Sequence, residues 1–101
     1  MTVLTPPKAC PSMPALRAQI DALDRQIVAM LATRAEYIDR AAELKLGEGL
    51  PARIPARVED VVSRVCAEAD RLGLDPDLTD DLWRRLIDWS IAREARALGC
   101  E

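Results

Sequence analysis

The chain has 101 residues, of which half are apolar and only 3% are aromatic, and its formal net charge is −3. This length corresponds to one domain, and the scarcity of aromatic and strand-forming residues favours an all-α fold. A net negative charge disfavours a main role in binding nucleic acid. The sequence has no histidine, which excludes imidazole acid–base catalysis, Ser-His triads and most zinc sites.

The three cysteines, Cys10, Cys66 and Cys100, are far apart in the sequence. Their number and spacing fit neither a metal motif nor a disulfide framework, so we expect a reducing compartment. The first residues contain no apolar core of the length found in signal peptides, and no segment approaches a membrane span. These features predict a cytoplasmic protein.

Residues 1–13 hold three of the seven prolines and show no hydrophobic periodicity. We expect them to form a flexible, proline-rich arm, followed by a helical domain over residues 14–101. Ser12 is suited to cap a helix that Pro14 opens. Gly47 and Gly49 are expected to end that helix just after residue 46.

Apolar residues of this first helix recur at alternating steps of three and four, which is the spacing of a heptad seam. They are Leu16, Ile20, Leu23, Ile27, Met30, Ile38 and Ala41. A helix of about thirty residues is longer than a compact domain of this size is wide. We therefore expect a second copy of the chain to cover the seam.

Two further helices follow after a proline-containing loop. Pro55 can open the second helix, and Gly73 is placed to end it. Asp75, which is followed by proline, is a suitable N-cap for a third helix that runs to about residue 98. The inward stripe of the third helix includes two polar residues, Ser90 and Glu94.

Cations occupy the inward stripe of the first helix, where Arg34 and Lys45 continue the apolar series and Arg17 lies beside its start. A charge on an inward face is costly unless it is paired. Arg34 and Lys45 share a face about 16 Å apart along the axis, so their long side chains can hold one small ligand. Arg17 is about 25 Å from Arg34 on another side of the helix, and it can reach this face only from an antiparallel partner helix.

The polar residues together suit a small dianion. Arg57 adds a cation near the loop, while Ser90 and Glu94 add hydrogen-bonding groups, without any nucleophile–base pair. Such a pocket can hold carboxylates, select a reactive conformer and stabilise charge that separates in the transition state. The structural alternative is that each inward cation sets helix register or reaches the surface. We expect the other arginines, including Arg84 and Arg93, to lie on solvated faces and to pair locally.

This joint pattern resembles the all-helical chorismate mutase family. The matching segments are LRAQIDALDRQIVAMLATRAEYIDRAAELK, IPARVEDVVSRVCAEADRLGLDPDL and LWRRLIDWSIAREA. The resemblance implies three-helix chains that form an intertwined homodimer, the chorismate mutase type II fold. It also implies two pockets that each borrow an arginine from the other protomer.

The implied reaction is the rearrangement of chorismate to prephenate, in aromatic amino acid biosynthesis, without cofactor or metal. The resemblance places substrate-binding roles on Arg17, as the borrowed arginine, and on Arg34, Lys45, Arg57, Val58, Ser90 and Glu94. Of these, Lys45, Glu94 and Arg34 are the expected catalytic residues. Lys45 and Glu94 would meet the negative charge that grows on the ether oxygen.

Two positions depart from the family pattern. Val58 stands where many mutases carry a glutamate, and the isochorismate-pyruvate lyase branch, which makes salicylate and pyruvate in siderophore pathways, also has an aliphatic residue there. Ser90 instead favours the ordinary mutase. Glu94 stands where many bacterial mutases have glutamine, and an ionised glutamate cannot donate a hydrogen bond to the ether oxygen. We therefore expect Glu94 to be protonated during catalysis.

Chorismate mutase is the first interpretation of the sequence. The first alternative is an isochorismate-pyruvate lyase, or a mutase that acts on a modified chorismate such as aminodeoxychorismate. The second alternative is a non-catalytic helical dimer that binds a carboxylate metabolite or partner helices.

Overall fold

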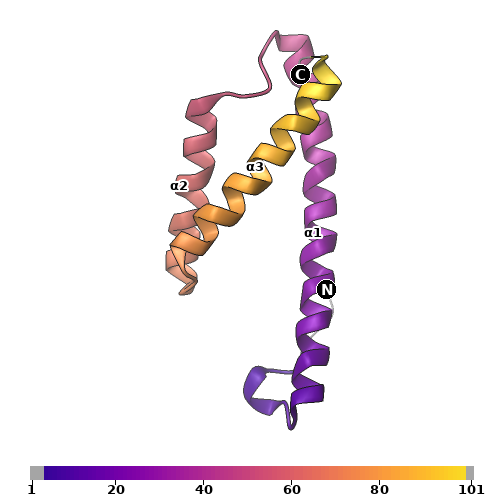
Figure 1. The fold of residues 1–101 in the computed structure, drawn as a ribbon, viewed down its shortest axis with the longest axis vertical. Coiled ribbons are helices and arrows are strands. Elements are labelled where there is room, and N and C mark those ends of the chain that lie inside the picture. Colours follow the sequence, from indigo (N-terminus) through magenta and orange to yellow (C-terminus); the bar gives the residue numbers. More distant parts are fainter. Residues whose placement is uncertain (1–3, 100–101) are drawn as a thin grey trace. The chain divides into compact units, whose positions relative to one another are not determined.

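The computed structural model describes residues 4–99. This part of the chain forms a short 3-10 helix, Pro7–Ala9, and three α-helices, α1 (Met13–Glu48), α2 (Pro55–Leu72) and α3 (Pro76–Leu98) (Figure 1). Within residues 4–99 there is no β-strand, so the predicted all-α class is confirmed. Residues 1–3 of the predicted arm, and residues 100–101 with Cys100, lie outside the described residues.

Capping residues determine most of the helix ends as predicted. The side-chain oxygen of Ser12 accepts a hydrogen bond from the backbone N–H of Ala15 at 3.3 Å, and the carboxylate of Asp75 accepts one from the backbone N–H of Asp77 at 2.9 Å. Gly73 ends α2 in the left-handed conformation, with φ of 76°. Each cap satisfies backbone groups that the helix itself leaves without partners.

The end of α1 differs from the prediction. Gly47 lies inside the helix, which continues to Glu48, and Gly49 follows with φ of 69°. A glycine inside a helix costs only about 1 kcal/mol relative to alanine, so Gly47 alone does not stop the helix. The left-handed residue Gly49 does, and the loop to α2 is shortened to residues 49–54.

The chain divides into two units between residues 36 and 37. In the first unit, residues 4–12 fold back on the beginning of α1, and the backbone N–H of Thr5 donates to Oε1 of Gln19 at 2.9 Å. An apolar hollow of about 400 Å³ lies between this segment and the helix, where Leu4 and Cys10 face Leu16 and Ile20. The flexibility of the arm stays a prediction.

The apolar seam of α1 is open to solvent in this first unit. Ile20, Leu23, Ile27 and Met30 expose 48%, 44%, 48% and 65% of their surface. None of the helices described here is long and apolar enough to cross a membrane. An exposed apolar face of this kind is typical of an interaction surface.

In the second unit, α2 and α3 run antiparallel and pack side by side (Figure 1). The buried apolar residues among those described are Ala42, Val62, Ala69 and Ile87, and no large side chain is fully buried. Thr79, Ser90 and Glu94 are buried to the same extent. The core of a single chain is therefore small, and polar groups make up much of it.

Candidate active site

Lys45 and Glu94 meet inside the second unit. Lys45 lies near the end of α1 and Glu94 near the end of α3, and the Nζ atom of Lys45 is 2.6 Å from Oε1 of Glu94. Their side chains are only 19% and 5% exposed. The inward charge of Lys45 is thus balanced within the chain, by a helix other than its own.

The backbone of the loop completes the surroundings of Lys45. Its ammonium donates a hydrogen bond to the carbonyl oxygen of Ala52 at 2.7 Å. Oε1 of Glu94, although close to the ammonium, is buried and receives no well-aligned hydrogen bond. The contact of Lys45 with Glu94 is therefore an ion pair, at 2.6 Å, without a directed hydrogen bond. A buried oxygen without a directed hydrogen bond is a group that a ligand atom can satisfy.

Ser90 lies one helical turn before Glu94, on the same face of α3. It is 3% exposed, and its hydroxyl donates to the carbonyl oxygen of Leu86 at 2.8 Å. Lys45, Ser90 and Glu94 are therefore the predicted site residues that the second unit gathers in its interior. Among residues 4–99, no three His, Cys, Asp or Glu side chains lie close enough together to hold a metal ion.

Arg57 and Val58, at the start of α2, have other surroundings. The guanidinium of Arg57 is 2.7 Å from Oδ2 of Asp60, and its side chain is 65% exposed. Val58 lines a cleft of about 220 Å³ between α2 and α3, beside Glu59 and Arg84. Arg84 binds both oxygens of Glu59, at 3.0 and 3.1 Å, and this hydrogen bonding lowers the pKa of Glu59. Glu59 is thus bound by Arg84 of α3. It does not take the place of the glutamate that many mutases carry at the position of Val58.

Arg17 and Arg34 belong to the first unit. Arg17 is exposed near the beginning of α1, and Arg34 is partly buried further along the same helix. Their contribution to a pocket stays a prediction.

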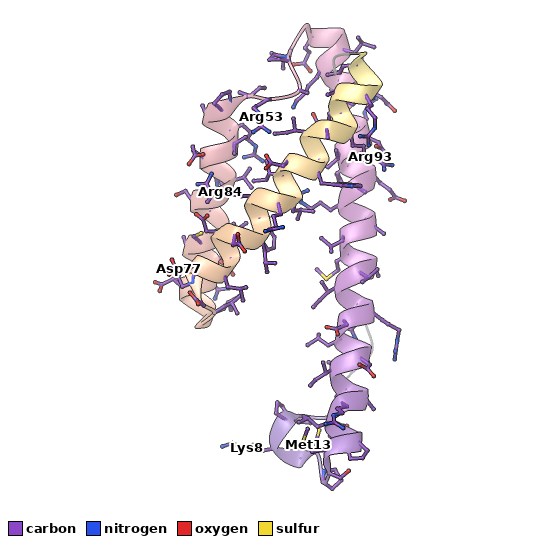
Figure 2. The ribbon with its side chains drawn as sticks, viewed as in Figure 1. Lys8, Met13, Arg53, Asp77, Arg84 and Arg93 are labelled. Atoms are coloured by element: carbon purple, nitrogen blue, oxygen red, sulfur yellow. The ribbon has the colours of Figure 1, made fainter. Side chains whose placement is uncertain are left out.

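Two arginines connect helices where we expected local pairs. Arg93 binds both carboxylate oxygens of Asp39 on α1, at 2.6 and 3.0 Å, and its guanidinium carbon lies 5.4 Å from the centre of the Trp89 ring. Hydrogen bonding from Arg93 lowers the pKa of Asp39. Arg84 joins α3 to α2 in the same way (Figure 2), but it also pairs with Oδ1 of Asp80 on its own helix at 2.9 Å. The prediction of a local pair is therefore confirmed for Arg84 and wrong for Arg93.

The signal that could have identified the α1–α3 pair was the position of its members beside the inward stripes. Asp39 follows Ile38, and Arg93 precedes Glu94. Residues that flank a buried stripe are the ones whose side chains can reach a crossing helix. The pair holds α3 against α1 directly next to Glu94.

Residues 16–95 match the protein family described as Chorismate mutase type II. Among known proteins, the chain is 38% identical over 80 residues to a T-protein of Enterobacter agglomerans and 34% identical over 79 residues to a T-protein of Haemophilus influenzae. These matches cover 79% and 78% of this chain but 21% of each T-protein.

A third relative is matched over most of both proteins. The chain is 31% identical over 91 residues to an isochorismate pyruvate lyase of Pseudomonas aeruginosa, which covers 89% of this chain and 88% of the lyase. Because the family match spans most of α1, all of α2 and most of α3, the chain belongs to the chorismate mutase type II family.

Proposed function

We propose that the protein is a chorismate mutase, which rearranges chorismate to prephenate. The observation that carries this proposal is the buried pair of Lys45 and Glu94 beside Ser90, in a chain of this family. An ammonium and a carboxyl group that are held together out of water can interact strongly with charge that develops on a substrate.

In this reaction the ether C–O bond breaks as a new C–C bond forms, and negative charge grows on the ether oxygen. Lys45 is the donor that meets this oxygen, and Glu94 donates the second hydrogen bond when it carries a proton. Charge-assisted hydrogen bonds contribute about 1.5–3 kcal/mol each. A millionfold acceleration needs roughly 8 kcal/mol, so two such bonds together with selection of a reactive conformer suffice.

We infer that the arginines hold the two substrate carboxylates, with Arg17 supplied by a second subunit. Arg34 binds a substrate carboxylate from α1. Arg57 leaves its ion pair with Asp60 and binds the substrate instead. That movement costs little, because an exposed ion pair contributes only about 0–1 kcal/mol. The exposed seam of α1 and the small core of the single chain support the intertwined dimer that this arrangement requires.

The second candidate function is an isochorismate-pyruvate lyase. Two observations favour it: the match to the Pseudomonas aeruginosa lyase over 88% of that protein, and an aliphatic Val58 in a position where a glutamate would hold the ring hydroxyl of chorismate. Ser90 is the residue that favours the mutase over this alternative.

Separate incubations of the purified protein with chorismate and with isochorismate test the proposal. We expect prephenate from chorismate, and neither salicylate nor pyruvate from isochorismate. Formation of salicylate and pyruvate would identify the lyase. Arg34→Ala is expected to abolish turnover while leaving assembly intact. If the wild-type protein converts neither substrate, the result would favour a non-catalytic helical dimer.

A further inference from the structure

The loop between α1 and α2 takes part in positioning Lys45. Its carbonyl group at Ala52 accepts a hydrogen bond from the Lys45 ammonium at 2.7 Å, while the same ammonium lies 2.6 Å from Glu94. The position of the ammonium therefore depends on where the loop backbone lies. The start of the loop is fixed by the backbone N–H of Leu50, which donates to the carbonyl oxygen of Lys45 at 2.9 Å.

The other end of the loop is joined to α3 by an ion pair. Arg53, the residue after Ala52, donates to Oδ1 of Asp88 at 2.9 Å. Figure 2 shows Arg53 where the loop leads into α2. Asp88 lies on α3 between Leu86 and Ser90. The carbonyl oxygen of Leu86 accepts the hydrogen bond of the Ser90 hydroxyl. The pair thus connects the residue next to the Ala52 carbonyl with the helix that carries Ser90 and Glu94.

We propose that the ion pair of Arg53 with Asp88, here called the loop latch, is a positioning device that holds the Ala52 carbonyl on Lys45 and so fixes the catalytic ammonium. Neither side chain touches the reacting atoms in this proposal. It rests on the proposed function, because Lys45 must act on a substrate for its position to matter.

The strength of the latch follows from its exposure. The side chains of Arg53 and Asp88 are 52% and 67% exposed, so solvent and salt weaken their attraction. Loss of an exposed pair of this kind changes the population of the closed loop by about two- to fivefold. The loop latch is therefore expected to tune activity and to make it depend on ionic strength.

The kinetic test compares Asp88→Asn with Asp81→Asn. Both aspartates are exposed residues of α3, and Asp81 pairs with Arg85 on its own helix, so it is a matched control. We expect Asp88→Asn to lower kcat/KM for the substrate that the wild type converts by about two- to fivefold at low salt, with little further loss as salt is added. Asp81→Asn should behave as wild type. Arg53→Asp combined with Asp88→Arg should recover most of the loss, because the attraction is restored with reversed sign.

A measurement independent of activity is cleavage of the native protein by trypsin after Arg53, followed by the mass of the released fragments. Asp88→Asn should speed this cleavage by about two- to fivefold, because Arg53 is released from α3. Asp81→Asn should not. Unchanged cleavage in Asp88→Asn would overturn the loop latch. Faster cleavage with unchanged kcat/KM would overturn its role in positioning Lys45. A wild-type protein without activity on either substrate would refute the proposed function, while the cleavage rates would still report on the tie between loop and α3.

Discussion

At the scale of single residues, Glu94 determines whether the proposed pocket offers a second hydrogen-bond donor beside Lys45. In the ion pair with Lys45 it is a carboxylate, which has no hydrogen to donate to the ether oxygen of a substrate. Glu94→Gln supplies a permanent amide donor, so kcat/KM at neutral pH should be at or above the wild-type value.

Steady-state kinetics of the wild type and Glu94→Gln, measured at neutral pH in one buffer, test this prediction. Ser90→Ala is a suitable control, since it changes the same face of α3 without altering Glu94. A glutamine variant with kcat/KM well below the wild-type value would contradict the role assigned to Glu94.

The sequence was sufficient to place Lys45, Ser90 and Glu94 on inward helix faces, because heptad spacing depends only on helix geometry. It was not sufficient to pair Lys45 with Glu94. That contact depends on how α1 and α3 cross, which no spacing within one helix reveals. The Ala52 carbonyl could not be predicted either, because a backbone acceptor has no side-chain signature.

At the scale of the helices, two glycines with opposite roles provide a matched pair of substitutions. Gly73 adopts φ of 76° where α2 ends, and Gly47 lies within α1. An added Cβ would meet nothing within 4 Å at either position, so only the backbone conformation matters. Gly73→Ala should lower the free energy of unfolding by about 1 kcal/mol. Gly47→Ala should raise it by roughly 0.5–1 kcal/mol.

Urea unfolding at one protein concentration, followed by circular dichroism, measures both changes. Equal effects of the two substitutions would contradict the conformational argument. The comparison also shows why the end of α1 was predicted two residues too early. Glycine composition alone does not distinguish a residue that continues a helix from one that takes the left-handed conformation.

The ion pairs between helices predict a loss of stability in acid. Arg93 lowers the pKa of Asp39, and Arg84 lowers that of Glu59. A carboxylate whose pKa is lower in the folded state binds fewer protons there than in the unfolded state. Its contribution is therefore complete at neutral pH and is lost as the pH falls below about 4.

The midpoint of urea unfolding, measured between neutral pH and pH 3, tests this expectation. It should stay nearly constant down to about pH 5 and then fall. Asp39→Asn should lower the midpoint at neutral pH and make its decrease in acid smaller. Arg71 and Glu68, which pair within α2, provide the control, since Glu68→Gln leaves the contacts between helices intact. A midpoint that rises on acidification would contradict the account.

At the scale of the whole molecule, the single chain leaves much of its apolar surface uncovered. Half of the residues are apolar. Yet the buried apolar residues among those described are Ala42, Val62, Ala69 and Ile87, and the seam of α1 is exposed. Burial of apolar surface is the main source of stability. A second subunit on this seam would supply it and would bring Arg17 to the partner's pocket.

Subunit mixing tests this central claim most directly. Arg17→Ala and Lys45→Ala should each be almost inactive as homodimers. After the two are unfolded and refolded together, half of the dimers should be mixed, and each should contain one pocket with both Lys45 and a borrowed Arg17. We predict recovery of about a quarter of the wild-type specific activity. A mixture no more active than the separate variants, from chains that sedimentation shows to have exchanged, would contradict a pocket shared between subunits.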